Sequence, residues 1–166
     1  MGTLAELAFA SDRSYMLDGE MAGTARLTLS GANFGWYPAT NGAFRLSTRF
    51  NGRAAELAAV GAARGCHLDA AQASQLGLIT FAVEEIDWAD DLRLYLEERL
   101  SFSPDALTAM EANLRSAGAE SMETKIFGRL TAWQNWVFQR PNAVGPEGAL
   151  QRYGTGQKPH FDIERV

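Results

Sequence analysis

The segment that most constrains the fold is a short helix followed directly by a strand, within residues 61–80. Asp69 suits the N-cap of that helix, because its carboxylate can accept hydrogen bonds from the free amides of the first turn. Gly77 suits the left-handed backbone that often ends a helix. The following run, residues 78–83, is rich in branched and aromatic side chains and predicts a strand. The pattern predicts an αβ unit, which is common to many folds.

Composition excludes several classes of function. The chain has 166 residues, of which 46% are hydrophobic, and this is enough to bury a core. Its net charge is -5 and its basic residues are scattered, which argues against a nucleic-acid partner. The single cysteine, Cys66, excludes an internal disulfide and fits a reducing compartment. With neither a signal-peptide pattern nor a long apolar run, we expect a cytoplasmic protein that does not enter a membrane.

The first half of the chain alternates between helical and strand patterns. Residues 2–10 have helical period, and Leu4, Leu7 and Ala8 are expected to form the buried face of that helix. The other elements expected here are strands over 12–17 and 25–30 and helices over 43–50 and 53–60. Together with the unit described above, they make residues 1–86 an αβ segment.

The second half reads as helices only. Helices are expected over 87–100, from Ser103 to near Gly118, and over 120–139, where Pro141 closes the last of them. We therefore predict a helical packing or oligomerisation module over 87–140 and a Gly- and Pro-punctuated tail over 141–166, with one helical turn around 147–153.

Aromatic side chains on the third of these helices predict a partner. Burial contributes about 25 cal/mol per Å² of apolar area, so water is an unfavourable environment for Trp133, Trp136 and Phe138. We expect these residues to face another domain or subunit, and the chain to be oligomeric rather than a stable monomer.

Motifs in both halves carry a resemblance to known proteins. Residues 61–80 resemble the crotonase (enoyl-CoA hydratase/isomerase) superfamily, in which a Gly and a basic residue precede an Ala-rich helix that ends in Leu-Gly-Leu. Five further stretches are similar to the C-terminal segment of the benzoyl-CoA-dihydrodiol lyase family, a longer, ring-opening branch of that superfamily: 7–19, 33–38, 103–108, 122–136 and 153–159. The resemblance implies an α/β fold, the C-terminal half of a crotonase-like ββα-superhelix core followed by an all-helical C-terminal module.

The resemblance also implies an activity. Lyases of this family hydrate and open the epoxidised ring of benzoyl-CoA to a dehydroadipyl-CoA semialdehyde and formate, in aerobic benzoate degradation. Such chemistry needs amides that hold the thioester oxygen and groups that move protons. No cofactor is implied, since coenzyme A is part of the substrate. The implied partners are the acyl-CoA thioester and the N-terminal remainder of the enzyme or a second subunit.

Two residues of the first helix are the implied catalytic candidates. Thr3 aligns with an amide that holds the thioester oxygen, at a helix N-terminus that favours negative charge. Glu6 matches one of the two carboxylates of the hydratase type, and Gly31 stands where the second would be. A lone glutamate cannot perform both proton transfers of a hydration, and Glu6 is also open to interpretation as a solvated or capping carboxylate.

The implied substrate-binding residues lie in the Gly-rich loop that borders the acyl pocket. They are Asn33, Tyr37 and Asn41, which could orient a ring oxygen or a water, or could simply support turns. No metal site is expected, because Cys66, His67 and His160 lack the spacing of metal ligands.

Three functions therefore stay open. The chain is part of a ring-opening acyl-CoA lyase, or it is a non-catalytic packing module that acts in trans on a complete acyl-CoA enzyme. A free-standing hydratase or isomerase is the third, and Gly31 argues against it.

Overall fold

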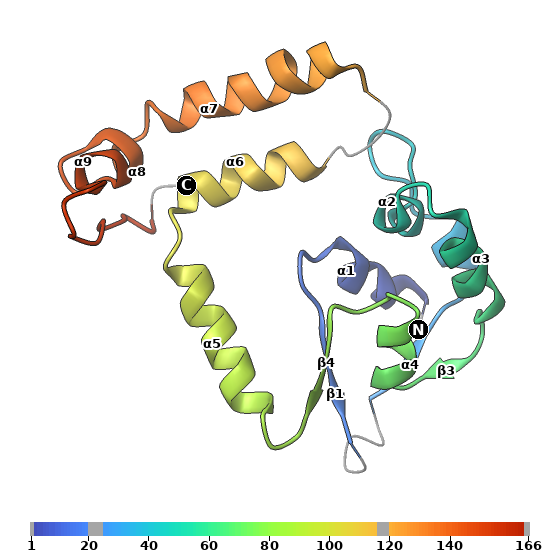
Figure 1. The fold of residues 1–166 in the computed structure, drawn as a ribbon. Helices are drawn as coiled ribbons and strands as arrows, with labels where there is room; N and C mark the ends of the chain where they lie inside the picture. The colour runs from blue at the N-terminus through green and yellow to red at the C-terminus, as the bar shows by residue number, and fades with distance from the viewer. Residues whose placement is uncertain (1, 20–24, 116–119, 165–166) are drawn as a thin grey trace. The chain divides into compact units, whose positions relative to one another are not determined.

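A computed structural model describes residues 2–19, 25–115 and 120–164, and these form two compact units, Met1–Leu94 and Tyr95–Val166 (Figure 1). The predicted boundaries at 86 and 140 stay predictions. Strands occur in the first unit, while the described part of the second is helical. Mixed helix and small sheets agree with the α/β class, and the crotonase superhelix stays a prediction.

The first unit follows the predicted order of helices and strands. Its elements are η1 (Gly2–Leu4), α1 (Ala5–Ala10), β1 (Tyr15–Asp18), β2 (Leu27–Thr28), η2 (Gly31–Phe34), α2 (Arg45–Phe50), α3 (Ala54–Ala62), β3 (His67–Leu68), α4 (Ala70–Gln75) and β4 (Phe81–Glu84). The strands are shorter than their sequence patterns.

Each strand pair joins segments far apart in the sequence. β1 pairs in parallel with β4, and the rings of Tyr15 and Phe81, opposite each other in the register, stack at 5.1 Å. β2 pairs antiparallel with β3, so that Thr28 lies opposite His67. Side chains directly opposite each other in an antiparallel pair lie on the same face. This second pair forms part of the site described below.

Helix α4 begins and ends as its sequence predicts. The Asp69 carboxylate accepts from the amide of Gln72 at 2.8 Å, and the Gln72 side chain accepts from the amide of Asp69, which completes a capping box. Gly77 has φ +68°, and a Cβ there would lie 3.3 Å from the Phe50 ring. The predicted strand over 78–83 was placed too early, because β4 begins only at Phe81.

The core of the first unit is apolar and continuous. Its most deeply buried residues come from the residue after β2, from the helices and from the turn after α4: Leu29, Leu46, Phe50, Val60, Ala70, Ala73 and Leu78. Arg49 closes one edge by donating from Nε to the carbonyl of Gly77 at 2.6 Å, and its partial burial lowers the pKa of the guanidinium.

The predicted buried face of the first helix was wrong at Leu4 and Leu7, while Ala8 is half-buried. Leu4 and Leu7 are 69% and 68% exposed, while Ala5 and Phe9 lie in the core. The reason is a set of polar contacts: the amide of Asn33 binds the carbonyl of Gly2 and the carboxylate of Glu6, which turns that face of the helix inward.

The second unit continues from α5, which spans the boundary between the units. Its helices are α5 (Trp88–Leu100), α6 (Pro104–Arg115), η3 (Thr124–Leu130), α7 (Thr131–Val137), α8 (Pro141–Val144) and α9 (Ala149–Arg152). The predicted helix over 120–139 forms as a π-helical segment, η3, followed at once by α7. Pro141 follows α7 as predicted and also opens α8. Gly118, where α6 was expected to end, lies outside the described residues.

Two polar residues, Asp105 and Asn142, are buried in the described part of the second unit. Asp105 is fully buried and accepts from Arg140 Nε at 3.1 Å, and the Arg140 guanidinium lies 4.8 Å from the Trp136 ring centroid. Asn142 exchanges two hydrogen bonds with the backbone of Asp162, which fixes the tail to α8. Among the residues described, no helix combines the length and the apolar character needed to cross a membrane.

Candidate functional site

The start of the first helix borders an open pocket of about 720 Å³ in the first unit. The pocket is lined by residues of η1, β2, η2 and β3 and of the loops beside them: Gly2, Thr3, Thr28, Leu29, Ser30, Gly31, Ala32, Trp36, Tyr37, Arg64, Gly65 and His67. Two of the five predicted site residues, Thr3 and Tyr37, are among them.

Thr3 and Tyr37 meet in this pocket. Their hydroxyl oxygens are 2.6 Å apart, although the residues are 34 positions apart in the sequence. Gly2 precedes Thr3 with φ +56°, and a Cβ on Gly2 would lie 2.7 Å from Ser30 Oγ. Only glycine therefore fits at this turn without displacement of Ser30. Gly2 is the first residue of η1, and η1 leads directly into α1. The first amides of a helix have no partners within that helix and point toward its N-terminal end.

Glu6 and Asn33 lie together, both buried, and neither lines the pocket. Glu6 Oε1 accepts from Asn33 Nδ2 at 2.6 Å, and Oε2 lies 3.3 Å from Arg45 Nη1. Both carboxylate oxygens thus have donors within the first unit. This arrangement joins α1 to η2 and α2, and the acid–base role of Glu6 stays a prediction.

Asn33 also shapes the pocket wall through the backbone. Its Oδ1 accepts from the amide of Ser30 at 2.9 Å, and Ser30 Oγ accepts from the amide of Ala32, which caps η2. Asn33 therefore does not line the pocket itself but holds Ser30, a residue that does. Asn41 is outside the lining and supports a turn, since its Oδ1 accepts from the amide of Ala43 at 3.0 Å.

Sequence reasoning did not select two pocket residues, Arg64 and His67, as site residues, although it considered His67 and set it aside as a metal ligand. His67 Nδ1 lies 2.8 Å from the hydroxyl of Thr28, its partner in the β2–β3 register. The Arg64 guanidinium lies 6.0 Å from the centroid of the Phe34 ring. No local sequence motif indicates that either residue lies in a site. Both come to the pocket only because distant segments pair and pack together.

The lining chemistry favours a ligand that carries oxygen atoms or negative charge. Four hydroxyl-bearing residues, Thr3, Thr28, Ser30 and Tyr37, line the pocket together with Arg64 and His67. Within the described part of the chain, its lining contains no Asp or Glu. Gly31, which the resemblance predicts to stand at the position of the second hydratase carboxylate, is one of the lining residues.

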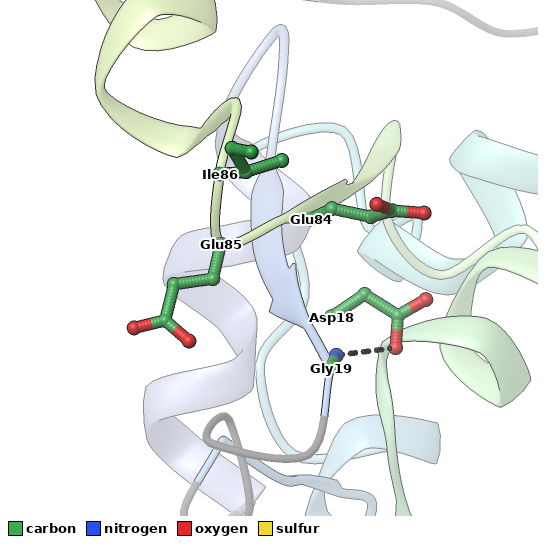
Figure 2. A pocket seen from close by; sticks show the side chains of 5 residues that line it. All are labelled: Asp18, Gly19, Glu84, Glu85 and Ile86. Carbon is green, nitrogen blue, oxygen red and sulfur yellow. Dashed lines mark hydrogen bonds between the residues drawn. The ribbon is translucent and has the colours of Figure 1, made fainter.

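A second hollow of the first unit, about 340 Å³, has the opposite character. It lies at the ends of β1 and β4 and is lined by Asp18, Gly19, Glu84, Glu85 and Ile86 (Figure 2). Asp18 accepts from the amide of Gly19 at 3.0 Å, and the side chains of Glu84 and Glu85 point in opposite directions. Across the described ranges, no group of three or more His, Cys, Asp or Glu residues could hold a metal ion.

Comparison with known proteins extends the resemblance to the whole chain. No family model matches the chain. Over 165 residues, 99% of its length, the chain is 52% identical to the benzoyl-CoA-dihydrodiol lyase of Aromatoleum evansii. The match covers 30% of that relative. The predicted resemblance to a segment of such a lyase is therefore confirmed, and the larger part of the relative has no counterpart in this chain.

Proposed function

We propose that this chain is part of a lyase that acts on a ring-modified benzoyl-CoA thioester, and that the pocket at Thr3 holds the thioester carbonyl oxygen. The identity of 52% to a benzoyl-CoA-dihydrodiol lyase supports the substrate class. The observation that carries the site is the position of Thr3 at a helix start, in a pocket lined by hydroxyls and two basic side chains.

The chemistry that this pocket would supply is stabilisation of developing negative charge. As the thioester takes on enolate character, its oxygen becomes a stronger acceptor for the Thr3 amide, and the helix N-terminus adds a favourable potential. Tyr37, through its hydrogen bond to the Thr3 hydroxyl, fixes the side chain beside that amide. The ring would occupy the remainder of the pocket, beside Trp36. In this proposal the reaction is ring opening with release of formate, and coenzyme A enters only as part of the substrate.

Glu6 acts in this proposal as a positioning residue. Its two oxygens bind Asn33 and Arg45, so it holds α1, η2 and α2 together behind the pocket. The Glu6→Gln variant separates this role from acid–base catalysis. We expect kcat to fall less than about tenfold, whereas loss of a general acid or base costs about 10²–10⁴-fold.

The experiment that tests the proposal is a replacement of the matching segment of the Aromatoleum evansii lyase by this chain. The full-length chimera should convert the epoxidised benzoyl thioester with release of formate. Gly2→Ala should reduce kcat at least tenfold, because the new Cβ displaces the turn that carries the Thr3 amide. Gly31→Ala is the matched control, since it lines the same pocket and its Cβ would meet nothing within 4 Å. An inactive chimera, or equal effects of the two variants, would contradict the proposal.

A second candidate function, packing without catalysis, is favoured by the surface of the second unit. Many large apolar side chains there are exposed, among them Leu100, Leu114, Phe127 and Tyr153. We propose the remainder of the lyase polypeptide as their partner, because most of the relative lies outside the matched segment. Co-expression with the remainder of the relative should give a stable complex, and Phe127→Lys should weaken it while Leu7→Lys, equally exposed on the first unit, should not. A complex that forms but releases no formate would support packing alone.

A further inference from the structure

The pocket contains one side chain suited to proton transfer near neutral pH. Neutral imidazole both donates and accepts protons, and the ordinary pKa of histidine lies closest to neutrality among side chains. His67 lines the pocket with Thr3, while the carboxylate of Glu6 lies outside the lining and is engaged by Asn33 and Arg45.

The position of the His67 ring is fixed by its strand partner. Thr28 is 6% exposed, and its hydroxyl lies 2.8 Å from His67 Nδ1 across the β2–β3 pair. The Thr28 hydroxyl can donate to or accept from Nδ1, and in the tautomer in which it accepts from Nδ1–H, Nε2 is left unprotonated for a ligand. With Nδ1 engaged in this way, Nε2 is the nitrogen left for a group bound in the pocket.

The charged and titratable groups near His67 are two pocket residues and three residues close to it along the chain or the strand pair. Arg64 and Tyr37 line the same pocket, and the Tyr37 hydroxyl is hydrogen-bonded to Thr3. Asp69, two residues along the chain, caps α4. Arg26, next to β2, donates to the carbonyl of Ala25. Cys66 beside His67 is an exposed free thiol. No carboxylate among the described pocket residues competes with His67 as a proton acceptor.

We propose that His67, oriented by Thr28, is a proton-transfer residue of this pocket. In the forward transfer, Nε2 takes a proton from a hydroxyl of the substrate or from a water: the N–H bond forms, the O–H bond breaks, and the electron pair stays on oxygen. The reverse transfer returns the proton to the product and restores neutral imidazole. In this arrangement the Thr3 amide binds the thioester oxygen and His67 transfers the proton. A histidine would thus do this work in a pocket whose described lining has glycine, Gly31, and no carboxylate. This inference rests on the proposed function.

The kinetic test uses the full-length chimera described above. His67→Gln should lower kcat at least 100-fold, change KM less than about threefold and remove the limb of the pH profile that reports the imidazole. His160→Gln, which changes the other histidine of the chain in the second unit, should leave kcat unchanged. Thr28→Val should lower kcat about tenfold, and Thr28→Ser should restore it.

The outcomes separate this inference from the proposed function. An active chimera whose His67→Gln variant keeps its kcat and its pH profile would overturn the role of His67 and leave the proposed function intact. An inactive parent chimera would overturn both. In the chain itself, long-range ¹H–¹⁵N NMR should show a single neutral tautomer for His67 that Thr28→Val converts to a mixture; a mixture already present in the parent chain would also overturn the inference.

Discussion

The two units both bury polar side chains, but they differ in how many large apolar side chains they bury. In the first unit, leucine, valine and phenylalanine residues form one continuous apolar core, with Leu29, Leu46 and Leu78 at most 1% exposed. In the described part of the second, the buried residues are Asp105, Ala109, Asn142, Ala143 and Gly148, while many larger apolar side chains are exposed. A core of small and polar residues gives little hydrophobic stabilisation. The first unit thus has a continuous apolar core, whereas the described part of the second buries few large apolar side chains.

The largest expected effect is in the apolar core. Leu78→Ala should reduce the free energy of unfolding by about 2–5 kcal/mol, because it removes a fully buried side chain and leaves a cavity. Leu114→Ala is the matched control: this leucine is 62% exposed and should cost less than about 0.5 kcal/mol. Urea denaturation measures both. Equal losses of unfolding free energy in the two variants would show that burial in the core of the first unit does not stabilise the chain more than an exposed leucine of the second unit.

The buried ion pair of the second unit should give the next largest effect. Asp105→Asn leaves Arg140 without its charge partner, and we expect a loss of about 2 kcal/mol, less than for a fully buried pair because the Arg140 side chain is 27% exposed. Asp90→Asn, at a carboxylate 78% exposed and paired with Arg93, should change stability by less than about 0.5 kcal/mol. If thermal unfolding does not distinguish the two variants, polar burial is not what holds the second unit together.

The smallest predicted effect tests the cap of α4. Asp69→Ala should cost about 1 kcal/mol, because the amide of Gln72 loses its acceptor. Asp69→Asn keeps an oxygen acceptor at the N-cap and should cost only a few tenths of a kcal/mol. Hydrogen exchange of the α4 amides reports on the helix directly, and identical protection in the two variants would contradict the capping account.

Local signals in the sequence predicted local structure well. Asp69 and Gly77 bound α4 as expected, and Ser103 and Pro104 stand where α6 begins. Periodicity failed at the first helix, where it selected Leu4 and Leu7 but the contacts of Asn33 turn another face inward. The π-helical geometry of η3 was also not predicted, because the spacing of apolar residues over 120–139 is that of an ordinary α-helix.

The candidate site could be predicted only in part. Thr3 and Tyr37 came from the resemblance, and the structure brings their hydroxyls together. The pair of Thr28 and His67 was missed because its members are 39 positions apart and meet only through strand pairing. Contacts of this kind depend on which strands pair. That pairing could not be predicted from the local pattern of two such short strands.

An NMR titration of the ¹⁵N-labelled chain with benzoyl-CoA, with coenzyme A alone as the control, tests most directly whether the first unit holds the thioester. The largest amide shifts should occur at Thr3 and its pocket neighbours Gly2 and Tyr37, should need the benzoyl group, and should be reduced by Gly2→Ala. Shifts confined to residues 95–164, or equal shifts with coenzyme A alone, would contradict the assignment of the thioester site to the first unit.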